Sequence, residues 1–596
     1  MAVLPGARSA GGLERADAPV HPEWNPMTSL PIKPGPRLLA LAALAVVILA
    51  IAVPTVLKRQ NDSNPDRSSA GAPSADDPTA VAAGPKIFRF YQESATSLDP
   101  ALASDSYSST VIAQIYSPLV GLTSDLEPTP QVADSWTISR DGLTYVFHIR
   151  SGVRFHNGRE VTAHDFAYCL TRQFVEPFRS QGLAAGYLDA IDGVPQFLRG
   201  QAKEIRGIQV VDDHRLRIKL SRPYRALLSA LALDQTSAVP RELLEAHGNA
   251  VLEVDPVGCG PFRFVRRDGQ NSVVLAANAD YFMGKPAIDT LVFYAPKGDV
   301  ISQGADALLD GRATLSSIPV DRFEEFRARE GITLLRWQDL TLSFLGMNNA
   351  MPPLNDARVR EAVAMAIDRQ AMLELQPEGK LLAQGILPAG LPGYSPMPRT
   401  YSHDVAKARQ LLVEAGYGPK HPLPTLAMYH RITTNTKLRE IDSLMVHSLA
   451  EAGITVAVHE VPWEKLNELI TTRKAPLFNL SWVADIPDPD TFLRALFYSS
   501  SSTNYFRYSN PKVDSLLNVA QRAEDPTVRQ RAYDGAEETI LREAAFVPLF
   551  HPTSFVGLRD NVVGLQMNPL GISTLAMEKL RFSEPRHDAE RRTAQR

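Results

Sequence analysis

The chain has 596 residues, of which 44% are hydrophobic and 21% are charged, and it is longer than one hydrophobic core normally supports. Its formal net charge of -4 and its pI near 6.4 argue against the basic surface that nucleic-acid binding requires. We therefore expect a globular protein of at least two lobes with no nucleic-acid partner.

An apolar segment near the N-terminus directs the chain to a membrane. Residues 38–57 carry no charge and follow Lys33 and Arg37, and a helix of this length, about 30 Å, spans a bilayer. The small residues Ala50 and Ala52 suit a signal peptidase, whereas the length of the run favours an uncleaved anchor. A cleaved signal peptide and a transmembrane helix both stay open, as does a true start at Met27.

The next informative pattern is a strand, a turn and a helix between residues 131 and 173. Apolar residues alternate with polar ones as in a half-buried strand, at Leu143, Tyr145, Phe147 and Ile149. Asn157-Gly158 predicts a tight turn. Thr162 lies three residues before Asp165, the spacing of a capping box at the start of a helix.

Other elements follow the same logic on both sides of this segment. We predict a strand at 87–91, a helix at 106–116, a hairpin at 208–220 and strands at 273–277 and 288–293. Beyond residue 300 strands alternate with amphipathic helices, which indicates a second αβ lobe. These helices are expected after Asp356, over 402–415 and around 438–449, before a strand at 454–461.

Several of these segments resemble the peptide-binding family of extracytoplasmic solute receptors, family 5, which serve dipeptide and oligopeptide ABC importers. The matching pieces occur in the family's order, and the most specific are Ala133-Asp134-Ser135-Trp136, Phe155-His156-Asn157-Gly158, Thr162-Ala163-His164-Asp165-Phe166, Gly258-Cys259-Gly260-Pro261-Phe262 and Tyr508-Ser509-Asn510-Pro511.

The resemblance implies an α/β protein with the type II periplasmic-binding-protein fold. Two lobes joined by a hinge would close around a ligand, and lobe 1 would carry an extra αβ subdomain. The expected parts are a cytoplasmic or artefactual segment at 1–37, a transmembrane helix or signal peptide at 38–57, a flexible linker at 58–85, lobe 1 at 86–296, lobe 2 at 297–546, a return to lobe 1 at 547–585 and a disordered tail at 586–596.

The same resemblance implies a receptor rather than an enzyme. It would capture a short peptide between its lobes and deliver it to an ABC permease, and because the sequence has no P-loop the ATPase would be a separate chain. We expect a monomer without cofactors outside the cytoplasm, in the periplasm or on the outer face of the cell membrane. A receptor for a metal chelate or oligosaccharide, and an anchored sensor without a transport role, remain alternatives.

The candidate ligand-binding residues are Asp485, Trp482 and Asp488, which follow a predicted strand. By the resemblance, Asp485 would pair with the ligand's α-ammonium group, because a desolvated ammonium needs a carboxylate. Trp482 would line the cleft. Asp490 is expected to cap the helix that starts at Thr491, and an acid–base pair of a glycosidase, formed by Asp485 with Asp488 or Asp490, is the catalytic alternative.

Three histidines and two cysteines complete the candidates. His148, His156 and His164 are evenly spaced, but we expect them on a strand, in a turn and at a helix start, where they would serve the scaffold and bind no metal. Cys169 and Cys259 leave a disulfide open. Where the family often has an acidic residue, this chain has Thr314.

Overall fold

The computed structural model describes residues 84–269, 272–396, 401–432 and 436–583. These described residues all belong to one compact unit. The expected segments at 1–37 and 38–57, the linker up to residue 83 and the tail at 586–596 lie outside the described residues. Within the described ranges, no helix is both long and apolar enough to span a bilayer.

One mixed sheet extends through both lobes. Among the described residues twelve strands take part, in the order β16-β15-β17-β13-β18-β11-β1-β10-β9-β8, with β12 and β14 also paired to β18. Their bounds are β1 Ile87–Tyr91, β8 Phe262–Asp268, β9 Ser272–Ala277, β10 Thr290–Tyr294, β11 Leu315–Ser317, β12 Ile332–Gln338, β13 Thr341–Met347, β14 Lys380–Leu382, β15 Leu426–Arg431, β16 Val456–Val461, β17 Leu477–Val483 and β18 Phe546–Arg559.

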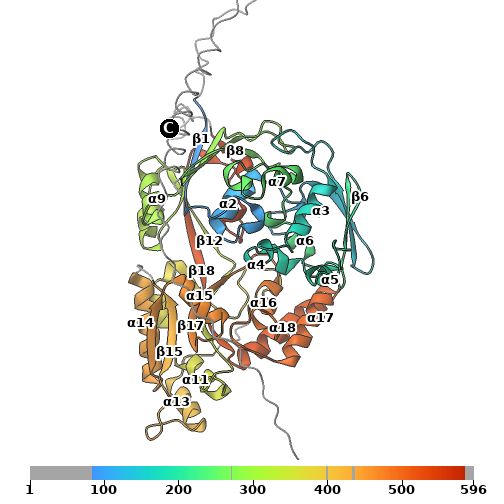
Figure 1. Cartoon of the computed structure of the whole chain (residues 1–596). Coiled ribbons are helices and arrows are strands. Elements are labelled where there is room, and N and C mark those ends of the chain that lie inside the picture. The colour runs from blue at the N-terminus through green and yellow to red at the C-terminus, as the bar shows by residue number, and fades with distance from the viewer. Residues whose placement is uncertain (1–83, 270–271, 397–400, 433–435, 584–596) are drawn as a thin grey trace, which may run out of the picture. The chain divides into compact units, whose positions relative to one another are not determined.

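Strand β18 connects the two halves of this sheet (Figure 1). Its first part pairs with β13, where Val547 lies opposite Leu345, and its second part pairs with β12 from Thr553 to Arg559. The chain therefore passes between the halves twice, once between β12 and β13 and once within β18. Two adjacent crossings are the arrangement that lets lobes hinge about a ligand.

The strand pairing moves the boundary that we expected between the lobes. Strand β11 pairs with β1, and Leu308 and Phe326 share a hydrophobic core with Tyr91, so residues 300–338 belong with the N-terminal strands. We therefore propose that lobe 1 comprises residues 84–338 and 553–583 and that lobe 2 comprises residues 341–551, in place of boundaries at 297 and 547.

The predicted subdomain of lobe 1 is a four-stranded sheet of order β4-β5-β7-β6 and lies at the right of Figure 1, beside α3. Its strands are β4 Ala133–Ile138, β5 Thr144–Ile149, β6 Ile208–Asp212 and β7 Arg215–Lys219. The strand–turn–helix prediction is confirmed: Gly158 has φ +91°, and helix α3, Ala163–Arg172, begins after Thr162, whose N–H donates to Asp165 at 2.9 Å.

Helices cover the sheet in both lobes. In lobe 1 they are α2 Ser106–Ile115, α4 Phe178–Gln181, α5 Val194–Leu198, α6 Leu227–Ala230, α7 Arg241–His247, α8 Val251–Val254, α9 Val300–Leu309 and α10 Phe323–Arg327. In lobe 2 they are α11 Ala357–Ala366, α12 Arg369–Glu374, α13 Val405–Glu414, α14 Thr436–Glu451, α15 Trp463–Thr471, α16 Leu493–Phe497, α17 Pro511–Arg522 and α18 Pro526–Arg542.

The helices of lobe 2 agree with the predicted amphipathic patterns, with one shifted start. The apolar face of α11 is buried, including Val359 and Val363. Helix α13 begins later than predicted, because the Asp404 side chain accepts a hydrogen bond from the Lys407 N–H and so takes the N-cap position.

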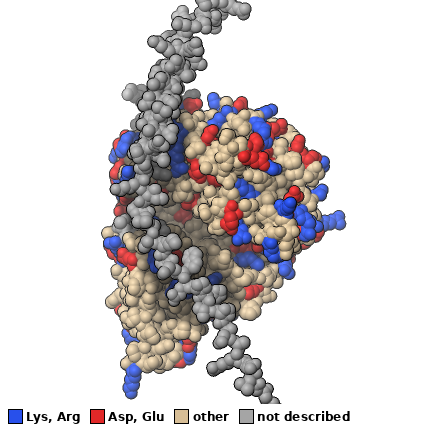
Figure 2. All heavy atoms as spheres, viewed as in Figure 1, with Lys and Arg blue, Asp and Glu red and all other residues tan. Residues whose placement is uncertain are grey.

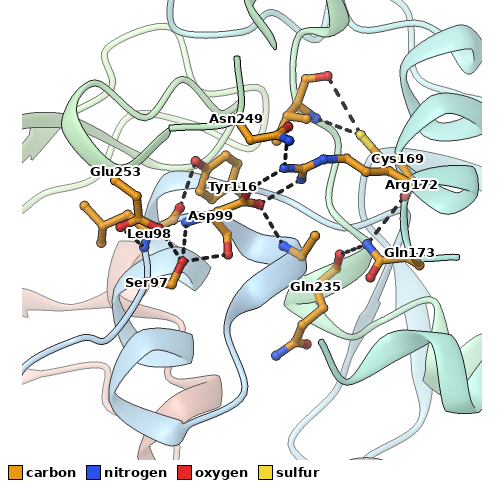
Figure 3. A network of polar contacts seen from close by, with 12 residues as sticks. Ser97, Leu98, Asp99, Tyr116, Cys169, Arg172, Gln173, Gln235, Asn249 and Glu253 are labelled. Carbon is orange, nitrogen blue, oxygen red and sulfur yellow. Dashed lines mark hydrogen bonds and ion pairs between the residues drawn. The ribbon is translucent and has the colours of Figure 1, made fainter. Parts of the chain in front are cut away.

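A buried ion pair holds the core of lobe 1 together (Figure 3). Arg172, on α3, donates to Asp99 at 2.8 Å and to Asn249 at 3.0 Å, and both members of the pair are almost fully buried. The Asp99 carboxylate also accepts the Ala101 N–H at 3.0 Å. Because each buried charge has a partner of opposite sign, this network serves the scaffold.

One face of the molecule shows no preference for one sign of charge. On the face seen in Figure 2, basic and acidic side chains are interspersed. This agrees with the small net charge of -4.

Candidate functional site

A cavity of about 270 Å³ lies between the lobes, beside the point where the chain crosses from β12 to β13. Lobe 1 contributes the end of β1, the starts of α2 and α9, and the loop at residues 569–572. Lobe 2 contributes Thr341, Val483 and Ala484. A concave space between two lobes with a few polar groups is the usual form of a small-ligand site.

Asp485 follows directly on the strand end that lines this cavity. Its carboxylate accepts a hydrogen bond from the Tyr187 hydroxyl at 2.5 Å, and that hydroxyl also lies 3.2 Å from the Thr491 hydroxyl. Burial raises the pKa of Asp485 to about 6, against the opposing effect of the Tyr187 hydrogen bond. The contact joins the lobes, because Tyr187 belongs to the subdomain of lobe 1.

Asp485 is a buried carboxylate with no cation beside it. Among the described residues, no Lys, Arg or His nitrogen lies within ion-pair distance of its carboxylate, whereas Asp99 has Arg172 and Asp488 has Arg529 at 2.7 Å. A desolvated carboxylate whose partner is only a hydroxyl is suited to receive a cation from outside.

Trp482 and Asp488 are turned toward the body of lobe 2. The Trp482 indole N–H donates to the Thr491 carbonyl at 2.7 Å, and its ring packs edge-on against Tyr505 at 6.4 Å between centroids. Asp488 is buried and accepts from the Asp490 N–H at 3.0 Å. Asp485 thus follows the cavity-lining residues Val483 and Ala484 in the chain, whereas Trp482 and Asp488 contact the body of lobe 2.

Asp490 does not cap the helix, contrary to our prediction. Asp488 caps the short 3-10 turn Pro489–Thr491 instead, because Pro489 occupies its first position and the Asp488 carboxylate reaches the Asp490 N–H. The Asp490 carboxylate accepts from the Tyr533 hydroxyl at 3.0 Å, and burial together with the nearby Asp488 charge raises its pKa to about 7.

The three histidines lie apart. His148 contacts Asp134 at 3.0 Å, His164 lies 3.5 Å from Asp213, and the His156 ring nitrogen lies 3.1 Å from the Gly260 carbonyl. Burial lowers the pKa of His156 to about 4. Within the described part of the chain, no three His, Cys, Asp or Glu side chains are placed to hold a metal ion.

The remaining sequence candidates belong to the framework. Cys169 and Cys259 are both buried free thiols. Thr314, at the position where the family often has an acidic residue, accepts the Arg89 N–H at 3.1 Å and so supports the edge of β1.

No sequence pattern pointed to two further residues, Tyr187, which contacts Asp485, and Asp339, which lines the cavity. Tyr187 is 298 positions from Asp485 in the chain and lies in a short 3-10 turn, Ala184–Tyr187. Asp339 lines the cavity at the crossing between β12 and β13, where neither periodicity nor a motif singles it out.

Comparison with known proteins assigns the family. Residues 127–504 match the model of the bacterial extracellular solute-binding proteins, family 5 Middle. The probable di/tripeptide-binding protein 5 of Pseudomonas aeruginosa (strain UCBPP-PA14) is 32% identical over 74% of this chain and 85% of its own length. The heme-binding protein A of Haemophilus influenzae is 28% identical over 77% of this chain and 85% of its own length.

The fold is also that of a solved relative. The ABC transporter-associated periplasmic binding protein DppA from Helicobacter pylori, in complex with peptide STSA, superposes with a TM-score of 0.72 at 26% identity, over 84% of this chain and 98% of that one. The two-lobed fold is therefore that of a type II periplasmic-binding protein. The chain belongs to the bacterial extracellular solute-binding proteins of family 5.

Proposed function

We propose that this protein is the substrate-binding receptor of an ABC importer, and that it captures short peptides between its lobes and delivers them to a membrane permease. It acts outside the cytoplasm, as a binding protein rather than an enzyme. The ATPase that drives transport is a separate chain.

The observation that carries this proposal is the buried, uncompensated carboxylate of Asp485, which directly follows the cavity-lining residues Val483 and Ala484 in the chain. A peptide's α-ammonium group would supply the missing positive charge, and the Tyr187 hydroxyl, 2.5 Å from the carboxylate, would hold that carboxylate in place. A charge-assisted contact of this kind is strong where water is excluded. Trp482 and Asp488 would position the loop that presents Asp485.

The ligands of two similar proteins support a peptide as the ligand of this protein. One similar protein is a probable di/tripeptide-binding protein, and a solved relative is in complex with the peptide STSA. Both ligands agree with an ammonium-binding carboxylate. Anchoring through residues 38–57 remains part of the proposal, with cleavage as its alternative.

The proposal is tested by isothermal titration of the full-length chain with Ala-Ala and with N-acetyl-Ala-Ala, which lacks the ammonium. Wild-type protein should bind only the free peptide, and Asp485→Asn should weaken that binding at least about 30-fold, since removing one partner of a buried charge pair costs about 2 kcal/mol or more. Asp321→Asn is the matched control, because Asp321 is an exposed carboxylate that does not line the cavity.

Native mass spectrometry of protein purified from cells identifies the natural ligand independently. A co-purified peptide that disappears in Asp485→Asn would support the proposal. Equal binding of the acetylated peptide, or a co-purified oligosaccharide or metal complex, would overturn it.

A further inference from the structure

Asp339 lies at the crossing between the lobes and faces the cavity. One carboxylate oxygen accepts a hydrogen bond from the Ser554 hydroxyl on β18. The other oxygen and the Trp337 indole nitrogen both face Gly571, where an added Cβ atom would lie 3.8 Å and 3.7 Å from them. The carboxylate is thus held by Ser554 and Trp337, and Gly571 lies over one of its oxygens.

Asp339 also lies beside the ammonium site proposed above. Thr341 pairs with Val483 across the sheet, and the Ala484 N–H donates to the Leu340 carbonyl at 2.8 Å. Asp339 precedes Leu340 and Asp485 follows Ala484, so the two residues flank the same end of this strand pairing along the backbone.

The cavity presents acceptors and negative charge. Its lining includes the carboxylates of Glu93 and Asp339, and none of its described lining residues is a lysine, arginine or histidine. Gln92 also lines it and is 6% exposed, and its side-chain oxygen has no hydrogen-bond partner among the described residues. Positive charges act on the lining from outside it: Arg312 and Arg89 act on Tyr91, and Arg431 acts on Tyr107.

If the cavity closed around a neutral ligand, its carboxylates would lose water and gain no positive charge in exchange, which is costly. A ligand cation removes that cost and forms charge-assisted hydrogen bonds. Aromatic rings of Tyr107 and Trp337 in the lining add surface on which an ammonium or guanidinium stem can pack.

We propose that the cavity is a second subsite, which takes a basic side chain from one of the first two residues of the peptide, and that Asp339 is its specificity-determining residue. The inference rests on the proposed function, since it assumes that Asp485 holds the peptide's α-ammonium group. It makes the protein a receptor that prefers lysine- or arginine-containing peptides.

The test compares peptide pairs that differ by one ammonium group, by titration of the full-length chain. Lys-Ala and Ala-Lys are each measured against the norleucine analogue, which keeps most of the apolar stem. Wild-type protein should bind at least one lysine peptide about tenfold or more tightly than its norleucine partner, the size expected of a charged hydrogen bond.

Asp339→Asn should abolish that preference and leave the affinity for the norleucine peptides within about twofold. Glu93→Gln should reduce the preference less, because Glu93 is exposed. Asp321→Asn, which removes an exposed charge away from the cavity, should leave both affinities unchanged. Binding of the norleucine peptides by Asp339→Asn also shows that the variant is folded.

Two results would overturn the inference and leave the proposed function intact: equal wild-type affinities within both pairs, or an equal loss for lysine and norleucine peptides in Asp339→Asn. Loss of all peptide binding is a different result. If wild-type protein bound none of the four peptides, the proposed function itself would fail, and the subsite with it.

Discussion

At the scale of single residues, three buried aspartates differ in the partner of their carboxylate. Asp99 and Asp488 each lie beside an arginine, Arg172 and Arg529, and such pairs are part of a satisfied scaffold. Asp485 has a tyrosine hydroxyl as its partner. The charge of this carboxylate is therefore uncompensated in the ligand-free protein, which is why its protonation should respond to pH and to ligand.

The pH dependence of peptide affinity follows from the pKa of Asp485. Burial raises this pKa from 3.8 to about 6, whereas a peptide amine stays protonated below about pH 7.5. An ammonium binds the ionised carboxylate, so protons compete with the ligand below pH 6. We expect the affinity for Ala-Ala to fall about tenfold between pH 7 and pH 5, measured by titration at both values.

The pH dependence of the stability of the ligand-free protein independently tests whether the pKa of Asp485 is raised. A carboxyl whose folded pKa exceeds its unfolded value takes up protons on folding between about pH 4 and 6, so its contribution to stability falls as pH rises through that window. Asp485→Asn removes this effect, and the variant should gain stability relative to wild type as the pH rises. Equal peptide affinity at pH 5 and pH 7 would contradict the assignment.

At the scale of elements, the glycine bracket Gly258-Cys259-Gly260 is a packing device. Gly260 donates its N–H to the Ile115 carbonyl at 2.8 Å, at the end of α2, and a Cβ atom at Gly260 would lie 2.6 Å from the Ile115 carbonyl carbon. The backbone of this segment can approach the helix only because no side chain intervenes.

Gly260→Ala should therefore lower the free energy of unfolding by about 1–3 kcal/mol, the usual cost of overpacking. The matched control is Gly535→Ala in the middle of α18, where an added Cβ meets only Leu516 at 3.5 Å or more. That change should be stabilising by up to about 1 kcal/mol, since alanine favours a helix. Urea unfolding of both variants measures these changes. An unchanged free energy of unfolding in Gly260→Ala would refute the close-packing argument.

Two other segments show how far the sequence predicted the secondary structure. The strand, turn and helix around residues 143–172 follow from signals within a few residues of one another, such as the Thr162 and Asp165 capping pair, and they are confirmed. The capping role of Asp490 was wrong, because two carboxylates compete for the N-cap position and Asp488, one residue ahead of Pro489, takes it. Local rules succeed where no such competition occurs.

The site was predictable only in part. Asp485 stands in a recognisable segment, but its partner Tyr187 is 298 positions away, and Asp339 reaches the cavity through the pairing of β13 with β17. Contacts between distant segments depend on tertiary packing, which periodicity and turn signals do not encode.

At the scale of the whole molecule, contacts between the subdomain of lobe 1 and lobe 2 hold the two together beside the cavity. In addition to the Tyr187–Asp485 hydrogen bond, Arg225 donates to the Glu524 carbonyl and Arg222 donates to Gln521 at 3.4 Å. Ile486, of lobe 2, packs in the hydrophobic core of the subdomain. These contacts are present only when the lobes meet, so they favour the form that encloses the cavity.

Removal of the two arginine contacts should shift the population toward separated lobes without affecting the ligand contacts. The apparent dissociation constant scales inversely with the fraction of protein that is competent to bind, and two hydrogen bonds at a partly exposed interface contribute about 1 kcal/mol together. Arg222→Ala with Arg225→Ala should thus bind Ala-Ala about fivefold more weakly. Small-angle scattering should show a larger radius of gyration for the ligand-free variant than for wild type, and the same radius once peptide saturates both.

Arg217→Ala is the control for this experiment, because Arg217 lies on β7 of the same subdomain and donates within it, to Gln209 at 3.2 Å. Its removal takes away a positive charge from the subdomain but no contact with lobe 2, so affinity and radius should match wild type. If the double variant also matched wild type in both measurements, the arginine contacts would not contribute to closure, and the Asp485 site would have to form by ligand contacts alone. A fall in affinity with an unchanged radius would instead locate the effect in the cavity, where neither arginine lies.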